Sequence, residues 1–308
     1  INVATRQLFT PYAVGLKSPH AFKDSDAVIN PGGRLFFISP WRGQSLIGTT
    51  YTYYDDHPDN FTVTKADIQA LLDEVNACYP PANLTLADVK FVYQGLVPIN
   101  GVHEETGNVQ RAKQYQIVDH RQDGLEGLLS VLGVKYTTAR DVAEKVINQV
   151  FAIWGEETPP SRSATMPLYG GDIPHFESFV EQVLQEQPCQ LDEGQLRPLL
   201  YNYGTAYKNV LNFYDQPGGE RPLTADLKLL RAEICHAVQN EMAQTLRDVI
   251  LRRTEIGTGG YPGDQMIRFC AEVMGQAMGW PEGRLLEEIE DVQQAFALAA
   301  GYVTAGIN

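Results

Sequence analysis

The sequence predicts an α+β fold, in which an antiparallel β-sheet with one or more helices is followed by an α-helical domain. Strand-forming runs dominate the first third of the chain, and strand signals become sparse after an acidic, proline-rich segment at residues 156–160. Between these parts, an apolar run leads through a short turn into a strong helix pattern. We therefore expect a sheet domain at residues 1–126, a strand–turn–helix unit at residues 127–155 and a helical domain at residues 156–308.

A β-hairpin is expected near the start of the sheet domain. The segments Arg34–Ile38 and Leu46–Thr50 are rich in strand-forming residues, and Pro40–Gly43 between them is a turn signal. Two strands separated by so short a connection pair in antiparallel orientation.

A helix follows the hairpin. Thr64 is a good N-cap, and Asp67 stands three residues on, where it can complete a capping box. Pro80 and Pro81 end the helix. Its apolar face at helical spacing consists of Ile68, Leu71, Leu72 and Val75.

Three more strand candidates precede the turn at the end of the apolar run. They are Lys90–Ile99, Lys113–His120 and Gly127–Gly133. The second alternates between apolar and polar residues, which is typical of a half-buried strand. The third is almost entirely apolar from Leu128 to Leu132, which predicts burial on both faces.

The helical domain contains two strong helix patterns. The longer one begins after Thr224, a good N-cap, and the final one is acidic and extends from Glu282 to about Ala300. His236 on the longer helix is expected to face solvent or to make a satisfied polar contact. Apolar residues at steps of three and four predict one continuous helix with a core-facing stripe, namely Leu227, Leu230, Ile234, Val238, Met242, Leu246 and Val249.

Composition excludes several functional classes. The net charge of -14 disfavours nucleic acid and anionic membrane surfaces as partners. No apolar run suits a transmembrane segment, and no signal peptide is expected. The histidines show no metal-ligand spacing, so no metal site is expected. The cysteines lack zinc or dense disulfide spacing, which predicts reduced, buried thiols in a cytoplasmic protein at Cys78, Cys189, Cys235 and Cys270.

The strand–turn–helix unit is the best candidate for a binding site. An apolar strand ends at Gly133, a basic residue follows at Lys135, and Thr137 and Thr138 open a helix. Unpaired N–H groups and a partial positive charge at a helix start stabilise an anion. A helix capped by one of these threonines, beside a surface lysine, also explains the pattern.

Several segments carry motifs that gain meaning together. Phe37–Thr50 contains F-x-x-P-W and I-G-T-T, Val92–Pro98 contains Y-x-G-x-V-P, and Gly133–Arg140 reads G-V-K-Y-T-T-A-R. Ala232–Ala243 reads A-E-I-C-H-A-V-Q-N-E-M-A, and Leu251–Thr254 reads L-R-R-T. In this order, the segments resemble the signatures of FAD-dependent glycerol-3-phosphate dehydrogenases.

The resemblance implies a fold, a reaction and a set of site residues. The family has a Rossmann-like FAD domain of α/β type, a substrate domain on an antiparallel sheet and a helical C-terminal domain. It oxidises sn-glycerol 3-phosphate to dihydroxyacetone phosphate, and electrons leave to a quinone or to oxygen. Lys113 and Lys135 are the implied contacts of the anionic substrate group, and no catalytic base is assigned. The implied flavin contacts are Gly133, Val134, Lys135, Thr137 and Thr138.

The chain departs from the family pattern in two ways. It has no G-x-G-x-x-G between a strand and a helix, because Gly257–Gly263 follows a helix and has proline at the third glycine position. Most of the FAD site is therefore expected outside this chain. In addition, Val97 replaces an arginine that serves as a phosphate ligand, Lys113 replaces a second arginine, Tyr51 replaces an aspartate, and Val134 replaces a glycine.

Two functional alternatives follow. The chain can be part of a divergent FAD-dependent oxidoreductase, with a phosphorylated alcohol, an electron acceptor such as a quinone or oxygen, and the missing N-terminal half or a second copy as partners. A related small alcohol can also replace glycerol 3-phosphate as substrate. Alternatively, the chain is a non-catalytic remnant or interaction module. A cytoplasmic location is expected, with peripheral membrane association as an alternative.

Overall fold

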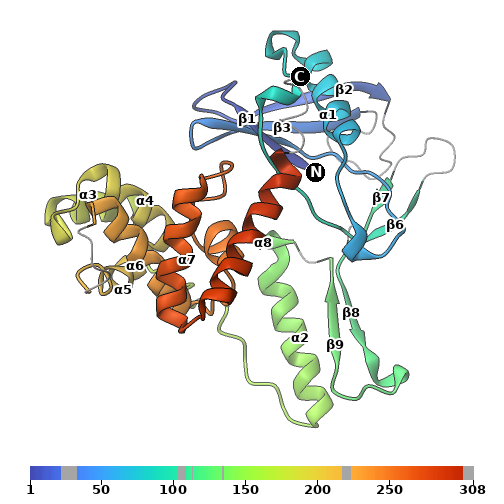
Figure 1. Ribbon diagram of the computed structural model, residues 1–308. Helices are drawn as coiled ribbons and strands as arrows, with labels where there is room; N and C mark the ends of the chain where they lie inside the picture. Colours follow the sequence, from blue (N-terminus) through green and yellow to red (C-terminus); the bar gives the residue numbers. More distant parts are fainter. Residues whose placement is uncertain (22–32, 103–108, 113, 134, 217–222, 301–308) are drawn as a thin grey trace. The chain divides into compact units, whose positions relative to one another are not determined.

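A computed structural model describes residues 1–21, 33–102, 109–112, 114–133, 135–216 and 223–300 of the 308-residue chain (Figure 1). The chain forms two compact units. The first, here called the sheet unit, comprises Ile1–Asp88 and Val92–Met166, and the second, the helical unit, comprises Val89–Phe91 and Pro167–Asn308. The domain boundaries expected from the sequence, at residues 126 and 155, stay predictions.

The main sheet has five strands in the order β2-β3-β4-β1-β5. The pairs β1–β4, β2–β3 and β3–β4 are antiparallel, which confirms the predicted hairpin. The hairpin turn places Arg42 and Gly43 at φ values of 49° and 73°, as a two-residue turn of this kind requires. The strands are β1 (Asn2–Arg6), β2 (Val14–Ala21), β3 (Gly33–Trp41), β4 (Gln44–Gly48) and β5 (Val89–Tyr93).

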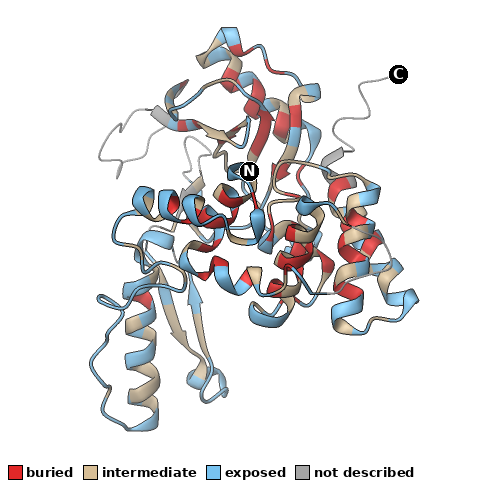
Figure 2. Ribbon diagram, turned by 90° about the vertical axis from the view of Figure 1, so that its left-hand side faces the viewer, coloured by how far each residue is buried: buried red, intermediate tan, exposed pale blue. Residues whose placement is uncertain are grey.

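One face of this sheet is buried. Phe36 and Ile38 of β3 are buried, whereas Leu35 and Phe37, which alternate with them, are exposed, as in a half-buried strand. Figure 2 colours the buried residues of the chain red. Helix α1 (Lys65–Cys78) contacts β2 and begins with the predicted capping box of Thr64 and Asp67. Its apolar face is buried as predicted, at Ile68, Leu71, Leu72 and Val75.

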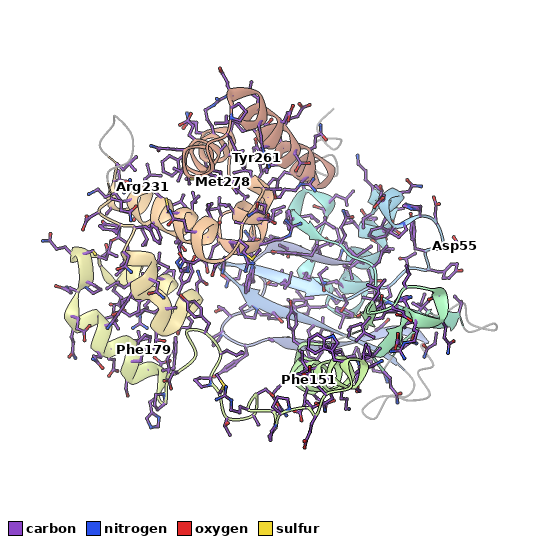
Figure 3. All side chains as sticks on the ribbon, turned by 90° about the horizontal axis from the view of Figure 1, so that it is seen from below. Asp55, Phe151, Phe179, Arg231, Tyr261 and Met278 are labelled. Carbon is purple, nitrogen blue, oxygen red and sulfur yellow. The ribbon has the colours of Figure 1, made fainter. Side chains whose placement is uncertain are left out.

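Two small antiparallel ribbons and one helix complete the elements of the sheet unit. The ribbons are β6 (Ile99–Val102) with β7 (Val109–Arg111), and β8 (Gln116–Asp119) with β9 (Leu129–Leu132). Helix α2 (Ala139–Trp154) follows β9. Figure 3 labels Phe151 of α2, whose ring packs edge-on against Trp154 with the ring centroids 5.6 Å apart.

The prediction that the strand before the turn is buried on both faces is wrong for the described chain. Leu128, Val131 and Leu132 are 47%, 38% and 47% exposed. The reason is that β9 has one neighbouring strand, β8, so an all-apolar run ends in a two-stranded ribbon instead of the centre of a sheet.

The helical unit contains two apolar cores. One lies among α3 to α6 and includes Leu196, Leu200 and Val210, and the other lies among α6 to α8 and includes Ile234, Ile267 and Val292. Arg231 of α6, labelled in Figure 3, is buried and donates through Nη2 to the carbonyl of Tyr214 at 3.0 Å. The helices are α3 (Phe176–Glu186), α4 (Glu193–Tyr203), α5 (Tyr207–Leu211), α6 (Ala225–Asn240), α7 (Asp264–Met278) and α8 (Glu282–Ala300).

The N-cap at Thr224 and the final acidic helix are confirmed, but the single long helix is wrong. Thr224 accepts from Leu227 N at 3.4 Å, yet α6 ends at Asn240. Met242 has a φ of 58° and is 80% exposed, so it cannot continue the core stripe. Leu246 and Val249 are buried because the chain returns to the same core through a π-helical turn at Asp248–Arg253.

The described residues contain neither a helix suited to span a membrane nor a cluster of metal-ligating side chains. In the part of the chain that the structure describes, no helix is long and apolar enough to span a bilayer. The same part of the chain brings no three His, Cys, Asp or Glu side chains together as potential metal ligands. The four cysteines are free, and burial varies among them: Cys270 is buried, whereas Cys189 is exposed, so the expectation of buried thiols is wrong for Cys189.

Candidate functional site

The turn after β9 lies against the segment that follows β5. Gly133 has a φ of 73°, and a Cβ added there would lie 3.4 Å from the carbonyl oxygen of Gln114, 3.6 Å from Cγ of Pro98 and 3.7 Å from Cα of Tyr115. Positive φ and close approach together favour glycine at this position. The structure therefore brings the predicted turn next to the Y-x-G-x-V-P segment, which lies far from it in sequence.

Residues 135–138 form an exposed entrance to α2. Lys135, Thr137 and Thr138 are all exposed, and Tyr136 is 100% exposed. The carbonyl of Lys135 accepts from Thr138 N at 3.0 Å and from Thr138 Oγ1 at 3.2 Å. Thr138 precedes α2 but does not cap the helix through its side chain, so the threonine-cap alternative is wrong at this residue. The first N–H groups of α2 thus lack that intramolecular acceptor.

A lysine of α2 forms a hydrogen bond with the tyrosine that directly precedes β8. Lys145 Nζ lies 2.8 Å from the hydroxyl of Tyr115 and 2.9 Å from Oδ2 of Asp141. These hydrogen bonds raise the pKa of Lys145, which therefore keeps its charge. A Cβ added at Gly133 would lie 3.7 Å from Cα of Tyr115, so the Lys145–Tyr115 hydrogen bond connects α2 to a residue beside the turn that precedes this helix.

Val97 and Ile99, the two sequence neighbours of Pro98, line a cavity of about 250 Å³, which we call the aromatic cavity. Its walls come from residues 50–54 after β4, residues 61–63 before α1 and residues 95–97 after β5, together with Ile1 and single residues of α1, β6 and β7. The amino group of Ile1 donates to the carbonyl of Thr50 at 2.8 Å. Tyr51 and Val97, two positions at which an uncharged residue replaces a charged residue of the family pattern, both line it. The structure thus gathers two departures from the family pattern in one place.

Local contacts fix the walls of the aromatic cavity. The rings of Tyr54 and Phe61 pack edge-on with centroids 5.2 Å apart, and the Tyr54 hydroxyl donates to the carbonyl of His57 at 2.7 Å. Val63 N donates to Oε1 of Gln94 at 3.4 Å, which joins the second wall to the third. Desolvation raises the pKa of Tyr54, and so do the nearby carboxylates of Asp56 and Asp55, the latter labelled in Figure 3. Tyr54 is thus a neutral hydroxyl at neutral pH.

The carboxylate that lines the aromatic cavity already has partners. Oδ2 of Asp67 accepts from Thr64 N at 2.9 Å and from Thr64 Oγ1 at 2.6 Å. Asp67 N in turn donates to Thr64 Oγ1 at 3.2 Å. The negative charge of the Asp67 carboxylate lies near the start of α1, where the helix dipole stabilises an anion.

The remaining predicted site residues lie outside the described part of the chain. These are Lys113 and Val134, so their roles stay predictions. Sequence reasoning missed the wall formed by Tyr53, Tyr54 and Phe61. The available signal was the aromatic density of residues 51–54 directly after the I-G-T-T motif, in place of the polar residues that a connecting loop usually contains.

The histidine of the helical signature is buried, which contradicts the expectation of solvent exposure or a satisfied polar contact. His236 is 0% exposed, and neither ring nitrogen has a hydrogen-bond partner among the described residues. Its Nε2 lies 3.7 Å from Oε1 of Glu241, and Tyr203 packs edge-on against the ring. Burial lowers the pKa of His236, while the Glu241 carboxylate raises it. This histidine belongs to the core and not to a surface site.

Comparisons with known proteins agree on one family. The C-terminal domain of alpha-glycerophosphate oxidase matches residues 161–285. The glycerol-3-phosphate dehydrogenase of Synechocystis sp. is 31% identical over 262 residues, which is 83% of this chain and 46% of that protein. The aerobic glycerol-3-phosphate dehydrogenase of Staphylococcus aureus is 27% identical over 233 residues, which is 72% of this chain and 40% of that protein.

A solved structure agrees in fold. The glycerol-3-phosphate dehydrogenase from Bacillus halodurans, solved in complex with FAD, matches with a TM-score of 0.69 and 21% identity over 96% of this chain and 56% of that one. The chain spans about half the length of the curated relatives it matches. From the ordered signatures, the shared fold and the 31% identity over most of its length, this chain belongs to the glycerol-3-phosphate dehydrogenase family.

Proposed function

We propose that this chain supplies the substrate-binding and flavin-closing parts of an FAD-dependent enzyme that oxidises the secondary hydroxyl of a glycerol-type alcohol to a ketone. The reference reaction, from the names of the relatives, is sn-glycerol 3-phosphate to dihydroxyacetone phosphate. The proximity of Gly133 to Pro98 carries the proposal, since a Cβ added at Gly133 would lie 3.6 Å from Cγ of Pro98, and Val97 and Ile99 on either side of Pro98 line the aromatic cavity. A cofactor edge and a substrate can therefore meet there.

The residues of the turn fit the pyrimidine edge of a flavin. The entrance to α2 at residues 135–138 is exposed, and Gly133 adopts the positive φ that lets the backbone approach closely. The flavin supplies a hydride acceptor whose pyrimidine edge gains negative charge on reduction. No G-x-G-x-x-G for the ADP half occurs in this sequence, so other sequence has to hold that half.

The chain's own residues act by charge and position. We propose that Lys135 and the N–H groups at the start of α2 stabilise the negative charge that develops on the pyrimidine edge of the flavin. Donors held in place beforehand do this without reorganisation. We assign Gly133, Thr137 and Thr138 to the backbone around that edge, and Val134, which lies outside the described residues, stays a predicted flavin contact. Lys113 remains the proposed contact for an anionic substrate group, as a point charge in place of an arginine.

Three further parts of the proposal rest on sequence. A quinone or oxygen is the electron acceptor, and the cellular location is cytoplasmic, with peripheral membrane association where the acceptor is a quinone. The macromolecular partner is the flavin-binding half of the protein, or a second copy of the chain. The alternative of a non-catalytic remnant is not favoured, because the turn that would face the flavin is exposed.

The test uses the whole protein that contains this chain. We expect purified protein to show flavin absorbance and to be bleached anaerobically by sn-glycerol 3-phosphate. Lys135→Met should weaken the binding of reduced flavin more than the binding of oxidised flavin. The reduction potential of the bound flavin should therefore fall. Lys208→Met, in the helical unit, is the control with the same change of charge. Colourless protein that does not bind added FAD would support the non-catalytic alternative.

A further inference from the structure

One asparagine–glycine pair occurs in the chain, at Asn100 and Gly101 of β6. None of the other asparagines is followed by glycine. Asparagine is chemically labile, because the peptide nitrogen of the next residue can attack its side-chain amide carbon. Glycine hinders this attack least, since it has no Cβ and its backbone rotates freely. In a folded protein, the outcome depends on how firmly the surrounding strand holds the backbone.

The ladder between β6 and β7 is irregular at this pair. Ile99 pairs with Arg111, and Gly101 pairs with Gln110, the next residue of β7. In the described ladder, Asn100 is therefore an extra residue on β6, as in a β-bulge. The ladder constrains such a residue less than its neighbours, so its backbone can rotate until the two reacting atoms meet.

Space and exposure also favour the reaction. Gly101 has a φ of 145°, and a Cβ added there would lie more than 4 Å from every described atom outside this glycine and its chain neighbours. Asn100 is exposed, so water and hydroxide ions reach its side chain. The β6–β7 ribbon has only two strands, and such a ribbon opens locally at a low cost in free energy.

We propose that Asn100 and Gly101 form a site of spontaneous deamidation. The nitrogen of Gly101, after loss of its proton to hydroxide, forms a bond to Cγ of Asn100. The bond between Cγ and Nδ2 breaks, and the amide nitrogen leaves as ammonia after taking a proton from water. Water then opens the resulting imide ring. Cleavage of the bond between Cγ and the Gly101 nitrogen gives aspartate, whereas cleavage of the original peptide bond gives isoaspartate.

Both products change β6 beside the candidate functional site. Each adds a negative charge at neutral pH, because an aspartate carboxyl has a pKa of about 3.9. Isoaspartate also inserts the β-carbon into the main chain. The preceding residue, Ile99, lines the aromatic cavity. The inference does not rest on the proposed function, because the reaction needs only the folded chain and water.

The test incubates the whole folded protein that contains this chain at mildly alkaline pH and follows its peptides by mass spectrometry. We expect the peptide with Asn100 to show the mass change from amide to carboxyl, faster at higher pH, and to account for most of the deamidation of this chain. Asn76, which precedes an alanine, is the internal control and should keep its amide. Its side chain is fixed by Leu84, since Oδ1 accepts from Leu84 N at 2.7 Å and Nδ2 donates to Leu84 O at 2.8 Å.

Two variants assign the mass change to this residue. Asn100→Gln lengthens an exposed side chain by one methylene, so the fold should be kept and most of the mass change at this position should be lost, because a larger ring would have to form. Asn240→Gln makes the same substitution at another exposed asparagine and should leave conversion at Asn100 unchanged.

A parallel sample in urea measures the reaction of the same bond in the unfolded chain. If Asn100 is converted in urea but keeps its amide in the folded protein, the fold protects the bond and the inference is wrong. It is also wrong if other asparagines of the folded chain are converted as fast as Asn100, since the bulge would then have no effect.

Discussion

The buried histidine of α6 should make the stability of the helical unit depend on pH. His236 is fully buried, and its Nε2 lies 3.7 Å from Oε1 of Glu241. Burial is the larger influence and lowers the pKa of His236, against the opposing effect of Glu241. The folded state therefore binds this proton more weakly than the unfolded chain, in which a histidine has a pKa of about 6.5.

The sign and size of the effect follow from proton linkage. Stability from this group is fully present above about pH 6.5 and is lost as the pH falls below that value, until the folded state is protonated as well. One group can contribute a slope of at most about 1.4 kcal/mol per pH unit. His236→Phe keeps a ring of similar shape and removes two nitrogens without hydrogen-bond partners among the described residues. We expect its unfolding free energy near neutral pH to stay within about 1 kcal/mol of the unchanged protein.

Urea unfolding monitored by tryptophan fluorescence, at about pH 7.5, 6.5 and 5.5, measures this slope. His236→Phe should lose less stability on acidification than the unchanged protein. Phe213→Leu is the control, because the Phe213 ring lies 6.3 Å from the His236 ring and cannot titrate. That control should shift stability equally at each pH. If His236→Phe kept the full acid sensitivity, the buried neutral histidine would not be its source.

Three other substitutions test the packing and the turn. Leu200→Ala removes a fully buried side chain of the helical core and should cost about 2–5 kcal/mol in urea unfolding. Thr64→Ala removes the hydroxyl that accepts from Asp67 N and should cost about 1 kcal/mol in the same assay, and Asp67→Ala should then add little more. Gly133→Ala forces a side chain into a φ of 73° and should cost about 1 kcal/mol, with a larger relative loss of FAD affinity measured by flavin fluorescence.

Local rules were sufficient where one short segment determines its own structure. The capping box of Thr64 and Asp67, the hairpin with its turn at Gly43, and the N-cap at Thr224 were predictable because each depends on residues within a few positions. The end of α6 was not, since the apolar spacing continues through Met242 while the chain turns there with a positive φ. Periodicity detects which side chains face a core, but it does not report a break when the chain returns to that core.

The burial predictions failed for a different reason. Leu128–Leu132 has the composition of a central strand, yet β9 pairs with β8 alone in the described chain. His236 is a polar residue of the kind expected on the solvent face of an amphipathic helix, yet the rings of Tyr203 and Phe213 pack against its ring. Composition reports the preference of a side chain, whereas its exposure depends on neighbours that can lie distant in sequence.

The two halves of the candidate site differ in how strongly they constrain the sequence. At Gly133 the backbone needs a positive φ and close approach, so few residues are acceptable and a recognisable motif results. The aromatic cavity needs only apolar volume, which many combinations of side chains can provide, so no motif marks it. The signal that the sequence did contain was the aromatic density of residues 51–54 directly after the I-G-T-T motif. Aromatic density in a connecting segment can therefore indicate the wall of a cavity that no positive motif marks.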